Sequence, residues 1–265
     1  MSELARRVWT AAVGAPLVLA AVYVGGAAAF ALVWAAATAV AFEFAGVARA
    51  VWGAWWPLPS MAAGWLVLAG AWRDGLRGWA LGATAGVLLL GVWCVWRAAR
   101  RDPAVAARAW AAAAAYLLVA PIPYAYFVLL RQTGRPQLLW AVLVIWAADM
   151  AAYFIGKAWG RHRLAPRVSP GKSWEGLAAA LAAGAAAGWG VARLAGWPEG
   201  PLAAASALLV AAGTVGDLFE SAFKRAAGLK DAGGLLPGHG GVWDRFDSLA
   251  FALPAAYWFW QLWRP

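Results

Sequence analysis

The residues best suited to chemistry lie in the last fifth of the chain. Asp217, Ser221 and Lys224 are spaced by four and then three residues, and Glu220 and Arg225 keep the same rhythm. A helix through this stretch therefore places all five on one face. Acids at one end and bases at the other suit a phosphate bound through a metal ion, because carboxylates hold the cation and ammonium or guanidinium groups bind the phosphate oxygens.

A glycine-rich turn and a second acidic pair follow. The turn reads Pro-Gly-His-Gly-Gly over residues 237–241, and its glycines let the backbone approach a ligand and offer N–H donors. Asp244 and Asp247 are three residues apart, again on one helical face. Hard carboxylate oxygens with little sulfur indicate Mg²⁺ rather than zinc. A solvated loop with casually paired charges is the alternative, but residues 217–247 hold five acids and the rest of the chain only seven.

A third polar segment, residues 169–176, reads Ser-Pro-Gly-Lys-Ser-Trp-Glu-Gly. Small residues, hydroxyls and Lys172 ahead of a helix suit phosphate binding by backbone N–H groups and the positive end of the helix. The spacing is not that of a Walker A motif. An ordinary helix N-cap is the alternative interpretation.

Two acids fall within apolar segments, where ionised side chains are costly and are functional candidates by default. Asp149 needs a partner in the helix bundle, and Tyr153 lies one turn further on the same face. Glu43 is equally well explained as a helix-end carboxylate beside Arg49 or as a functional residue.

Membrane-spanning helices must position these residues. The chain of 265 residues is 64% hydrophobic and 13% charged, whereas a soluble domain carries about 25% charged residues. This excludes a cytosolic enzyme, a nucleic-acid-binding module and a disordered protein. The 21 Trp residues fit a membrane protein, since indole favours the lipid–water interface. Cys94 is the single cysteine, so no intrachain disulfide forms.

The hydropathy pattern predicts an all-α polytopic integral membrane protein with about nine transmembrane helices and a polar, cytoplasm-facing site at the ends of the C-terminal helices. The nine candidate spans are residues 8–24, 27–47, 58–72, 79–96, 110–130, 138–155, 177–195, 202–215 and 249–263. The eighth can continue as a helix through Asp217 to Phe223. A cleavable signal peptide is the alternative for the first span, but the next span begins immediately.

These spans divide the chain into two regions. Residues 1–137 contain about five spans, and residues 138–265 form a catalytic region of about four spans with cytoplasmic loops 157–175 and 217–247. With the N-terminus in the cytoplasm, 16 of the 22 Lys and Arg residues fall on the cytoplasmic side and six on the other. The positive-inside rule therefore predicts a cytoplasmic N-terminus and a cytoplasmic active site. The expected location is the bacterial inner (cytoplasmic) membrane.

The segment from Ser221 to Asp247 resembles the signature of the phosphatidate cytidylyltransferases, the CDP-diacylglycerol synthases. Its 27 residues read S-A-F-K-R, then four residues of no fixed type, then K-D-A-G-G-L-L-P-G-H-G-G-V-W-D-R-F-D. Asp149 with Tyr153, and residues 169–176, resemble preceding blocks of that family. Two departures are Gly171, where the family commonly has a second base, and Met150, where it commonly has a hydroxyl.

The resemblance implies a nucleotidyltransferase that uses CTP, phosphatidate and Mg²⁺, with a second cation such as K⁺, to make CDP-diacylglycerol and pyrophosphate. The catalytic residues that it implies are Asp217, Lys224, Arg225, Lys230, Asp231, Asp244, Arg245 and Asp247. Metal binding is expected at Asp217, Asp231, Asp244 and Asp247. Substrate binding is expected at Asp149, Ser169, Lys172, Ser221, His239, Gly240 and Gly241. Expected partners are CTP, phosphatidate, membrane lipids and, by analogy with the family, a second copy in a homodimer, but no nucleic acid.

Two other functions are weighed against this one. An ion-coupled transporter would use intramembrane acids such as Asp149 and Glu43, but it predicts carboxylates spread through several spans and broken, repeated helices. A CTP-dependent transferase acting on another lipid phosphate or a polyprenol would share the same motif. The motif would bind the phosphate headgroup, whereas the lipid chain would be selected by an apolar groove.

Overall fold

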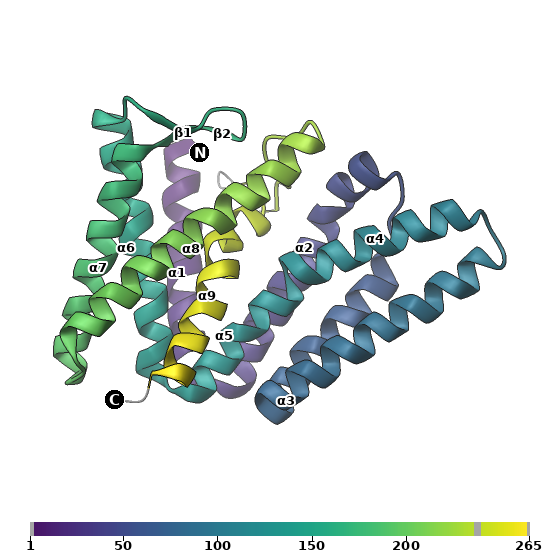
Figure 1. Cartoon of the computed structure of the whole chain (residues 1–265), viewed down its shortest axis with the longest axis horizontal. Helices are drawn as coiled ribbons and strands as arrows, with labels where there is room; N and C mark the ends of the chain where they lie inside the picture. Colours follow the sequence, from purple (N-terminus) through teal and green to yellow (C-terminus); the bar gives the residue numbers. More distant parts are fainter. Residues whose placement is uncertain (1–2, 236–239, 264–265) are drawn as a thin grey trace. The chain divides into compact units, whose positions relative to one another are not determined.

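The structure, a computed structural model, describes residues 3–235 and 240–263, which form nine helices and one short two-stranded sheet (Figure 1). The helices are α1 Glu3–Val24, α2 Gly26–Trp52, α3 Pro57–Ala98, α4 Pro103–Val119, α5 Pro121–Thr133, α6 Arg135–Trp159, α7 Trp174–Ala195, α8 Glu199–Ala226 and α9 Trp243–Leu262. The strands are β1 Arg163–Ala165 and β2 Ser169–Ser173.

The chain divides into two compact units. Unit 1 consists of Met1–Gln132 and Phe223–Phe246, and unit 2 of Thr133–Ala222 and Asp247–Pro265. These units do not coincide with the predicted regions 1–137 and 138–265, because the segment that contains most of the signature belongs to unit 1. The sequences of α8 and α9 each contribute to both units.

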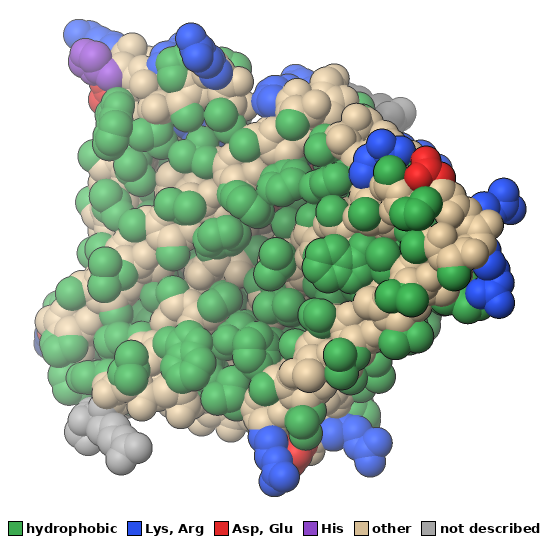
Figure 2. Space-filling view, turned by 45° about the vertical axis from the view of Figure 1, so that its right-hand side comes forward, with side chains coloured by type: hydrophobic (Ala, Val, Ile, Leu, Met, Phe, Trp, Pro, Cys, Tyr) green, Lys and Arg blue, Asp and Glu red, His purple; other side chains and the backbone are tan. Residues whose placement is uncertain are grey.

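In the described part of the chain, six helical segments are long and apolar enough to cross a membrane, by length and composition. They are Gly26–Trp52, Pro57–Ala98, Pro103–Thr133, Arg135–Trp159, Trp174–Ala195 and Glu199–Ala226. Figure 2 shows hydrophobic side chains over most of one face, with Lys and Arg side chains gathered at its edges. The chain is a largely helical integral membrane protein, as expected, but the predicted count of nine spans is not confirmed.

One of these six segments contains two predicted spans. Within α3 the backbone leaves the helical conformation at Asp74 and Gly75, and Gly75 takes a positive φ of 57°, which glycine adopts without steric cost. A Cβ at Gly70 or Gly78 would collide with the backbone of the other residue. The two arms of α3 therefore lie against each other and correspond to the separate predicted spans 58–72 and 79–96.

The predicted span 110–130 lies within the candidate span Pro103–Thr133, whose helix is interrupted once. The structure has α4 and α5 here, separated at Ala120, whose φ of −132° and ψ of −76° are not helical. Pro121 follows directly, and a proline lacks a backbone N–H and disfavours the helical conformation of the preceding residue.

Long-range contacts of large side chains hold unit 1 together. The Tyr116 hydroxyl donates to the carbonyl of Ala37 at 2.9 Å, which joins α4 to α2. The ring of Phe44 in α2 lies 6.2 Å from that of Tyr116 and 5.3 Å from that of Trp243. Arg131 donates to the carbonyl of Val22 at 2.6 Å, so α5 is joined to α1.

Small residues allow close helix packing in unit 2. A Cβ at Gly188 in α7 would collide with Ser206 in α8. The two helices can therefore lie this close only because small residues occupy the contact. Trp140 in α6 donates through its indole N–H to the Ser206 hydroxyl at 2.8 Å. A Cβ at Gly216 would lie 2.5 Å from the carbonyl oxygen of Asp247, so α8 and α9 meet where their polar residues begin.

The predicted loop 157–175 contains a short β-hairpin that the sequence does not predict, within a fold that is otherwise helical as expected. β1 and β2 pair antiparallel, with Arg163 opposite Ser173 and Ala165 opposite Ser169. The Ser173 hydroxyl accepts from the N–H of Gly176 at 3.1 Å and caps α7, as the N-cap interpretation of this segment proposed.

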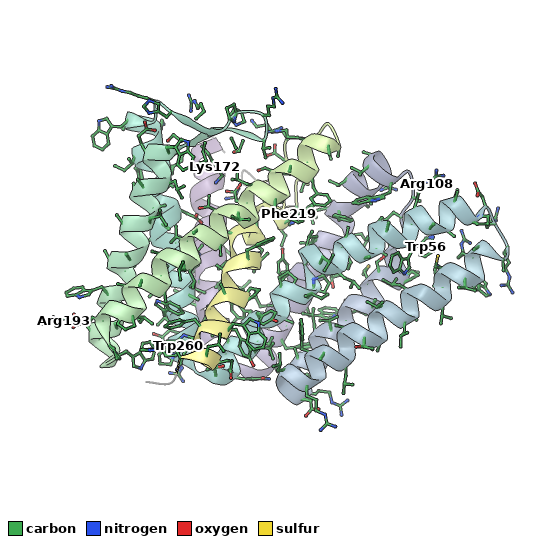
Figure 3. The ribbon with its side chains drawn as sticks, in the orientation of Figure 1. Trp56, Arg108, Lys172, Arg193, Phe219 and Trp260 are labelled. Carbon is green, nitrogen blue, oxygen red and sulfur yellow. The ribbon has the colours of Figure 1, made fainter. Side chains whose placement is uncertain are left out.

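Lys172 therefore enters the structure from a strand and not from a loop. It lies at one end of α7, and Arg193 lies at the other end of the same helix (Figure 3).

Candidate active site

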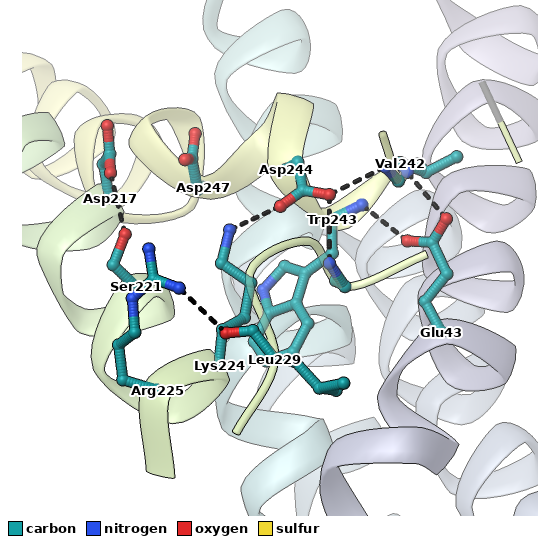
Figure 4. A network of polar contacts seen from close by, with 12 residues as sticks. Glu43, Asp217, Ser221, Lys224, Arg225, Leu229, Val242, Trp243, Asp244 and Asp247 are labelled. Carbon is teal, nitrogen blue, oxygen red and sulfur yellow. Dashed lines mark hydrogen bonds and ion pairs between the residues drawn. The ribbon is translucent and has the colours of Figure 1, made fainter. Parts of the chain in front are cut away.

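The predicted site residues form two groups, one in each unit, and both groups draw on α8 and α9. The unit 2 group consists of Lys172, Asp217, Glu220, Ser221 and Asp247. The unit 1 group consists of Glu43, Lys224, Asp244 and the backbone N–H groups of Ala232, Gly241, Val242 and Trp243. Figure 4 shows the contacts of Glu43, Lys224 and Asp244 in the unit 1 group and the contact between Ser221 and Asp217 in the unit 2 group.

An ion pair between Lys172 and Asp217 joins β2 to α8 in the unit 2 group. The ammonium nitrogen lies 2.5 Å from Asp217 Oδ2, and the two side chains are 28% and 26% exposed. Ser221, one helical turn later, donates its hydroxyl to Asp217 Oδ1 at 3.4 Å. The predicted continuation of the helix through these residues is confirmed, since α8 extends to Ala226. A partly accessible lysine and a hydroxyl thus lie at one carboxylate.

Asp247 lies in the early turns of α9, ahead of its apolar residues, and adds a second carboxylate to this group. Its Oδ1 accepts from the N–H of Ser248 at 2.6 Å, and it shares a hydrogen bond with Glu220, which is 2% exposed. Burial raises the pKa of Asp247 to about 7, and the charges of Asp217 and Asp149 contribute to the rise. The group therefore brings together carboxyl groups that repel one another, and a cation bound there would relieve that repulsion.

A buried ion pair between Lys224 and Asp244 is the centre of the unit 1 group. The two side chains are only 10% and 7% exposed. The other carboxylate oxygen of Asp244 accepts from the N–H of Ala232 at 3.2 Å and from the N–H of Gly241 at 2.7 Å (Figure 4). Asp244 thereby holds the lysine of α8 and the backbone at Ala232 and Gly241 at once.

Glu43 in α2 also belongs to this group. Its two carboxylate oxygens accept from the N–H groups of Val242 and Trp243 at 2.8 and 2.9 Å. Arg49 donates instead to the carbonyl of Ala45 at 3.1 Å. Glu43 is therefore bound to the start of α9 and not paired with Arg49.

Four other predicted catalytic residues are exposed side chains of unit 1. Arg225 donates to the carbonyl of Leu229 at 3.1 Å. Lys230, Asp231 and Arg245 are exposed around the signature segment. Such positions are open to a substrate that approaches from solution.

The remaining predicted substrate-binding residues are placed as follows. Gly240 has a positive φ of 79°, which accounts for glycine there, and Gly241 donates to Asp244. His239 lies outside the described residues. Ser169 begins β2, opposite Ala165. Asp149 is an exposed residue of α6, and its charge acts on Asp247.

Glu220 was not assigned a role from the sequence, although it falls on the same helical face three residues after Asp217. Its burial and its hydrogen bond with Asp247 depend on the packing of α9 on α8 in unit 2. Position on the face was the available signal, but it does not distinguish a buried acid from a solvated one.

The donor chemistry of Asp217 and Asp247 fits a Mg²⁺ ion. Among the residues that the structure describes, no set of three or more His, Cys, Asp or Glu side chains is arranged to hold a metal. Mg²⁺ needs only one or two protein carboxylates, however, because it keeps several waters and takes phosphate oxygens from its substrate. Asp244 fits less well, since Lys224 and two N–H groups already engage its oxygens. Metal binding by Asp231 stays a prediction.

Comparison with known proteins connects these residues to a family. The model of the cytidylyltransferase family matches residues 5–263. The chain is 49% identical over 132 residues to a phosphatidate cytidylyltransferase of Pseudomonas aeruginosa, 42% over 132 residues to one of Haemophilus influenzae, and 46% over 127 residues to one of Brucella suis. These matches cover 48%, 46% and 48% of this chain and 49%, 44% and 47% of the relatives. The chain spans about half the length of the curated relatives it matches.

Proposed function

Because the chain belongs to the cytidylyltransferase family, we propose that it transfers the cytidylyl group of CTP to phosphatidate in phospholipid biosynthesis. The products are CDP-diacylglycerol and pyrophosphate. The names of the matched relatives support this reaction, and an integral membrane protein suits a lipid substrate. The observation that carries the proposal is the buried Lys224–Asp244 pair, because it holds a cationic group inside the segment that resembles the family signature.

The proposed reaction is an in-line displacement at phosphorus. An oxygen of the phosphatidate phosphate attacks the α-phosphorus of CTP, a new P–O–P bond forms, and the bond from the α-phosphorus to the bridging oxygen of the β-phosphate breaks. Pyrophosphate leaves with the electron pair of that bond. The lipid phosphate is itself a competent nucleophile, so no covalent intermediate with the enzyme is needed. The main obstacle is repulsion between two anions, which cationic groups must reduce.

Lys224 is proposed as one of these cationic groups. An ammonium group has three N–H donors, so it can bind a phosphate oxygen while Asp244 continues to hold it. Arg225, Lys230 and Arg245 supply further positive charge from exposed positions. The backbone N–H groups of the glycine turn would bind phosphate oxygens in the same way.

The unit 2 group is proposed to bind Mg²⁺ and some of the phosphate oxygens of the substrates. Asp217 and Asp247 would hold Mg²⁺, which neutralises charge on the nucleotide phosphates and on the leaving pyrophosphate. Lys172 and Ser221, both in contact with Asp217, would donate to phosphate oxygens. A second cation such as K⁺ and a homodimer remain predictions from the family resemblance.

The protein is proposed to lie in the bacterial inner membrane with its site on the cytoplasmic side. CTP is a cytoplasmic metabolite, and phosphatidate reaches the enzyme from the surrounding leaflet. The distribution of Lys and Arg residues along the chain supports this orientation.

A reaction with purified protein tests the proposal. The protein in detergent micelles receives phosphatidate, Mg²⁺ and CTP labelled at its α-phosphorus, and parallel samples receive a polyprenol or an isoprenoid-ether phosphate as acceptor. We expect label in CDP-diacylglycerol together with an equal amount of pyrophosphate. Label in another lipid and none in CDP-diacylglycerol would favour the related CTP-dependent transferase. No labelled lipid from any acceptor, with the helical fold intact by circular dichroism, would contradict a transferase altogether.

A further inference from the structure

Glu43 is a charged residue in an otherwise apolar stretch of α2. The helix contains no other charged residue before Arg49, and the Glu43 side chain is only 6% exposed. A carboxylate in such a position is costly unless a partner satisfies it.

The partner of Glu43 is the beginning of α9. Its Oε1 accepts from Val242 and its Oε2 from Trp243, which is the first residue of that helix. The first N–H groups of a helix have no acceptor within the helix, and the helix dipole favours an anion beside them. A carboxylate supplied by α2, 199 and 200 residues earlier in the chain, fills this role.

The signature segment is shaped to approach this carboxylate. A Cβ at Gly233 would lie 2.6 Å from Glu43 Cγ, and a Cβ at Gly241 would lie 2.6 Å from Glu43 Oε2. Real Cβ atoms do not lie this close to their neighbours, so a side chain at either position would shift the Glu43 carboxylate or the segment itself. Gly234, next to Gly233, has open space at its Cβ position.

Glu43 and Asp244 hold the same short segment at adjacent residues. Glu43 binds the N–H groups of Val242 and Trp243, and the next residue is Asp244, which pairs with Lys224 and accepts from Ala232 and Gly241. A shift of the first turn of α9 would therefore move Asp244 relative to Lys224. Figure 4 shows this sequence of contacts from Glu43 through the backbone to Asp244 and Lys224.

We propose that Glu43 is a positioning residue: its carboxylate fixes the first turn of α9 so that Asp244 presents the Lys224 ammonium group to the reacting phosphates. The catalytic part of this statement rests on the proposed function. The structural part, that Glu43 protects the N–H groups of Val242 and Trp243, does not.

Replacement Glu43→Gln tests the proposal with little change in volume. Glutamine keeps one acceptor but turns an N–H₂ donor toward the N–H group that the second oxygen had bound. We expect kcat for CDP-diacylglycerol formation to fall about 100-fold. KM for CTP is expected to change by about twofold or less, because the displaced lysine is needed most for the charge that develops in the transition state. An unchanged kcat would overturn the proposal.

A double variant separates positioning from an independent effect. If Glu43 acts through Lys224, Glu43→Gln combined with Lys224→Met has the same residual rate as Lys224→Met alone. If the two losses multiply, Glu43 acts in another way and the proposal is wrong.

A pair of neighbouring glycines provides a test that leaves the carboxylate in place. Gly233→Ala pushes the segment away from Glu43 and is expected to reduce kcat about as much as Glu43→Gln. Gly234→Ala, one residue later with open space at its Cβ position, is the matched control and keeps the wild-type rate. Equal activity of the two alanine variants would contradict the proposal. Thr38→Val, which removes the Trp65 contact of the same helix α2, controls for general damage to that helix.

Hydrogen exchange measured by mass spectrometry tests the contact of Glu43 with α9 without requiring enzyme activity. Peptides that cover residues 240–246 of the full-length protein in detergent are compared between wild type and Glu43→Gln. Faster exchange at Val242 and Trp243 in the variant is expected, and unchanged exchange would overturn the proposal. If wild type makes no CDP-lipid but the exchange difference is present, the proposed function fails while the role of Glu43 in holding α9 stands.

Discussion

The ammonium group of Lys172 lies 2.5 Å from a carboxylate oxygen of Asp217, and this ion pair ties β2 to α8 within unit 2. Each partner is about a quarter exposed, so both remain accessible to ligands. A phosphate that binds Lys172 and a cation that binds Asp217 would replace one ion pair by two. The pair thus suits a site that receives a nucleotide phosphate together with Mg²⁺.

Lys172→Met removes the cationic partner of Asp217 and keeps most of the apolar stem. We expect kcat/KM for CTP to fall by about 10- to 1000-fold, since charged contacts to a transferring phosphoryl group contribute on this scale. Steady-state rates with varied CTP measure the change. Arg193→Met at the other end of α7 breaks an exposed pair with Glu199 and is the matched control, with unchanged rates. Equal effects of the two replacements would argue against a phosphate role for Lys172.

Asp244→Asn is expected to abolish turnover and also to destabilise the protein. It leaves the ammonium group of Lys224 buried without its counter-charge, and breaking a buried pair costs about 3–5 kcal/mol. Thermal unfolding in detergent, measured beside the rate, is therefore required. The buried contacts of Asp244 make a loss of stability the expected companion of the loss of turnover. A variant with wild-type turnover would contradict the role of Asp244.

Gly216→Ala is expected to impair the packing of α9 on α8 beside the acidic residues. The added Cβ would lie 2.5 Å from the carbonyl oxygen of Asp247, and overpacking of this kind costs about 1–3 kcal/mol. A lower melting temperature and reduced turnover should appear together. Gly190→Ala in α7 meets no atom within 4 Å and is the control. That variant keeps or slightly raises the melting temperature, because alanine is the better helix former.

The parts of the fold that local sequence could predict are the helices and their polar ends. Apolar runs of span length and the spacing of Asp217, Ser221 and Lys224 are local features, and they correctly predicted that α8 continues beyond its apolar residues. The polar contacts depend on residues far apart in the chain. Lys172 and Asp217 are 45 residues apart, and Glu43 and Val242 are 199 apart. No local pattern indicates such pairs before the helices are packed.

The hydropathy pattern also does not predict local interruptions of the helices. Ala120 separates α4 from α5 within a run that is apolar throughout, and hydrophobicity does not register the effect of Pro121 on the preceding backbone. The β-hairpin before α7 contains few apolar residues, so it has no strand periodicity to read. The oxygens of Glu175 accept from the N–H groups of Arg161 and His162 at 3.2 Å and close this hairpin onto α7.

Cysteine labelling tests the proposed orientation of the membrane spans. Gly171→Cys and Arg193→Cys, each introduced with Cys94→Ser, place single thiols at opposite ends of α7. The thiols are treated with a membrane-impermeant maleimide in spheroplasts, whose inner membrane is intact. We expect labelling at position 193 and none at position 171. The reverse pattern would place the site on the outer side, away from CTP.

A Mg²⁺ titration of CDP-diacylglycerol formation shows whether cytidylyl transfer depends on Mg²⁺ bound by the acids of α8 and α9. Wild type and Asp217→Asn are compared at saturating CTP and phosphatidate after removal of metal with a chelator. We expect no product without Mg²⁺. For Asp217→Asn we expect the Mg²⁺ concentration at half-maximal rate to rise about 10- to 100-fold, the scale on which partners of a metal site change affinity. Coincident titration curves, or full activity without a divalent cation, would contradict this proposal.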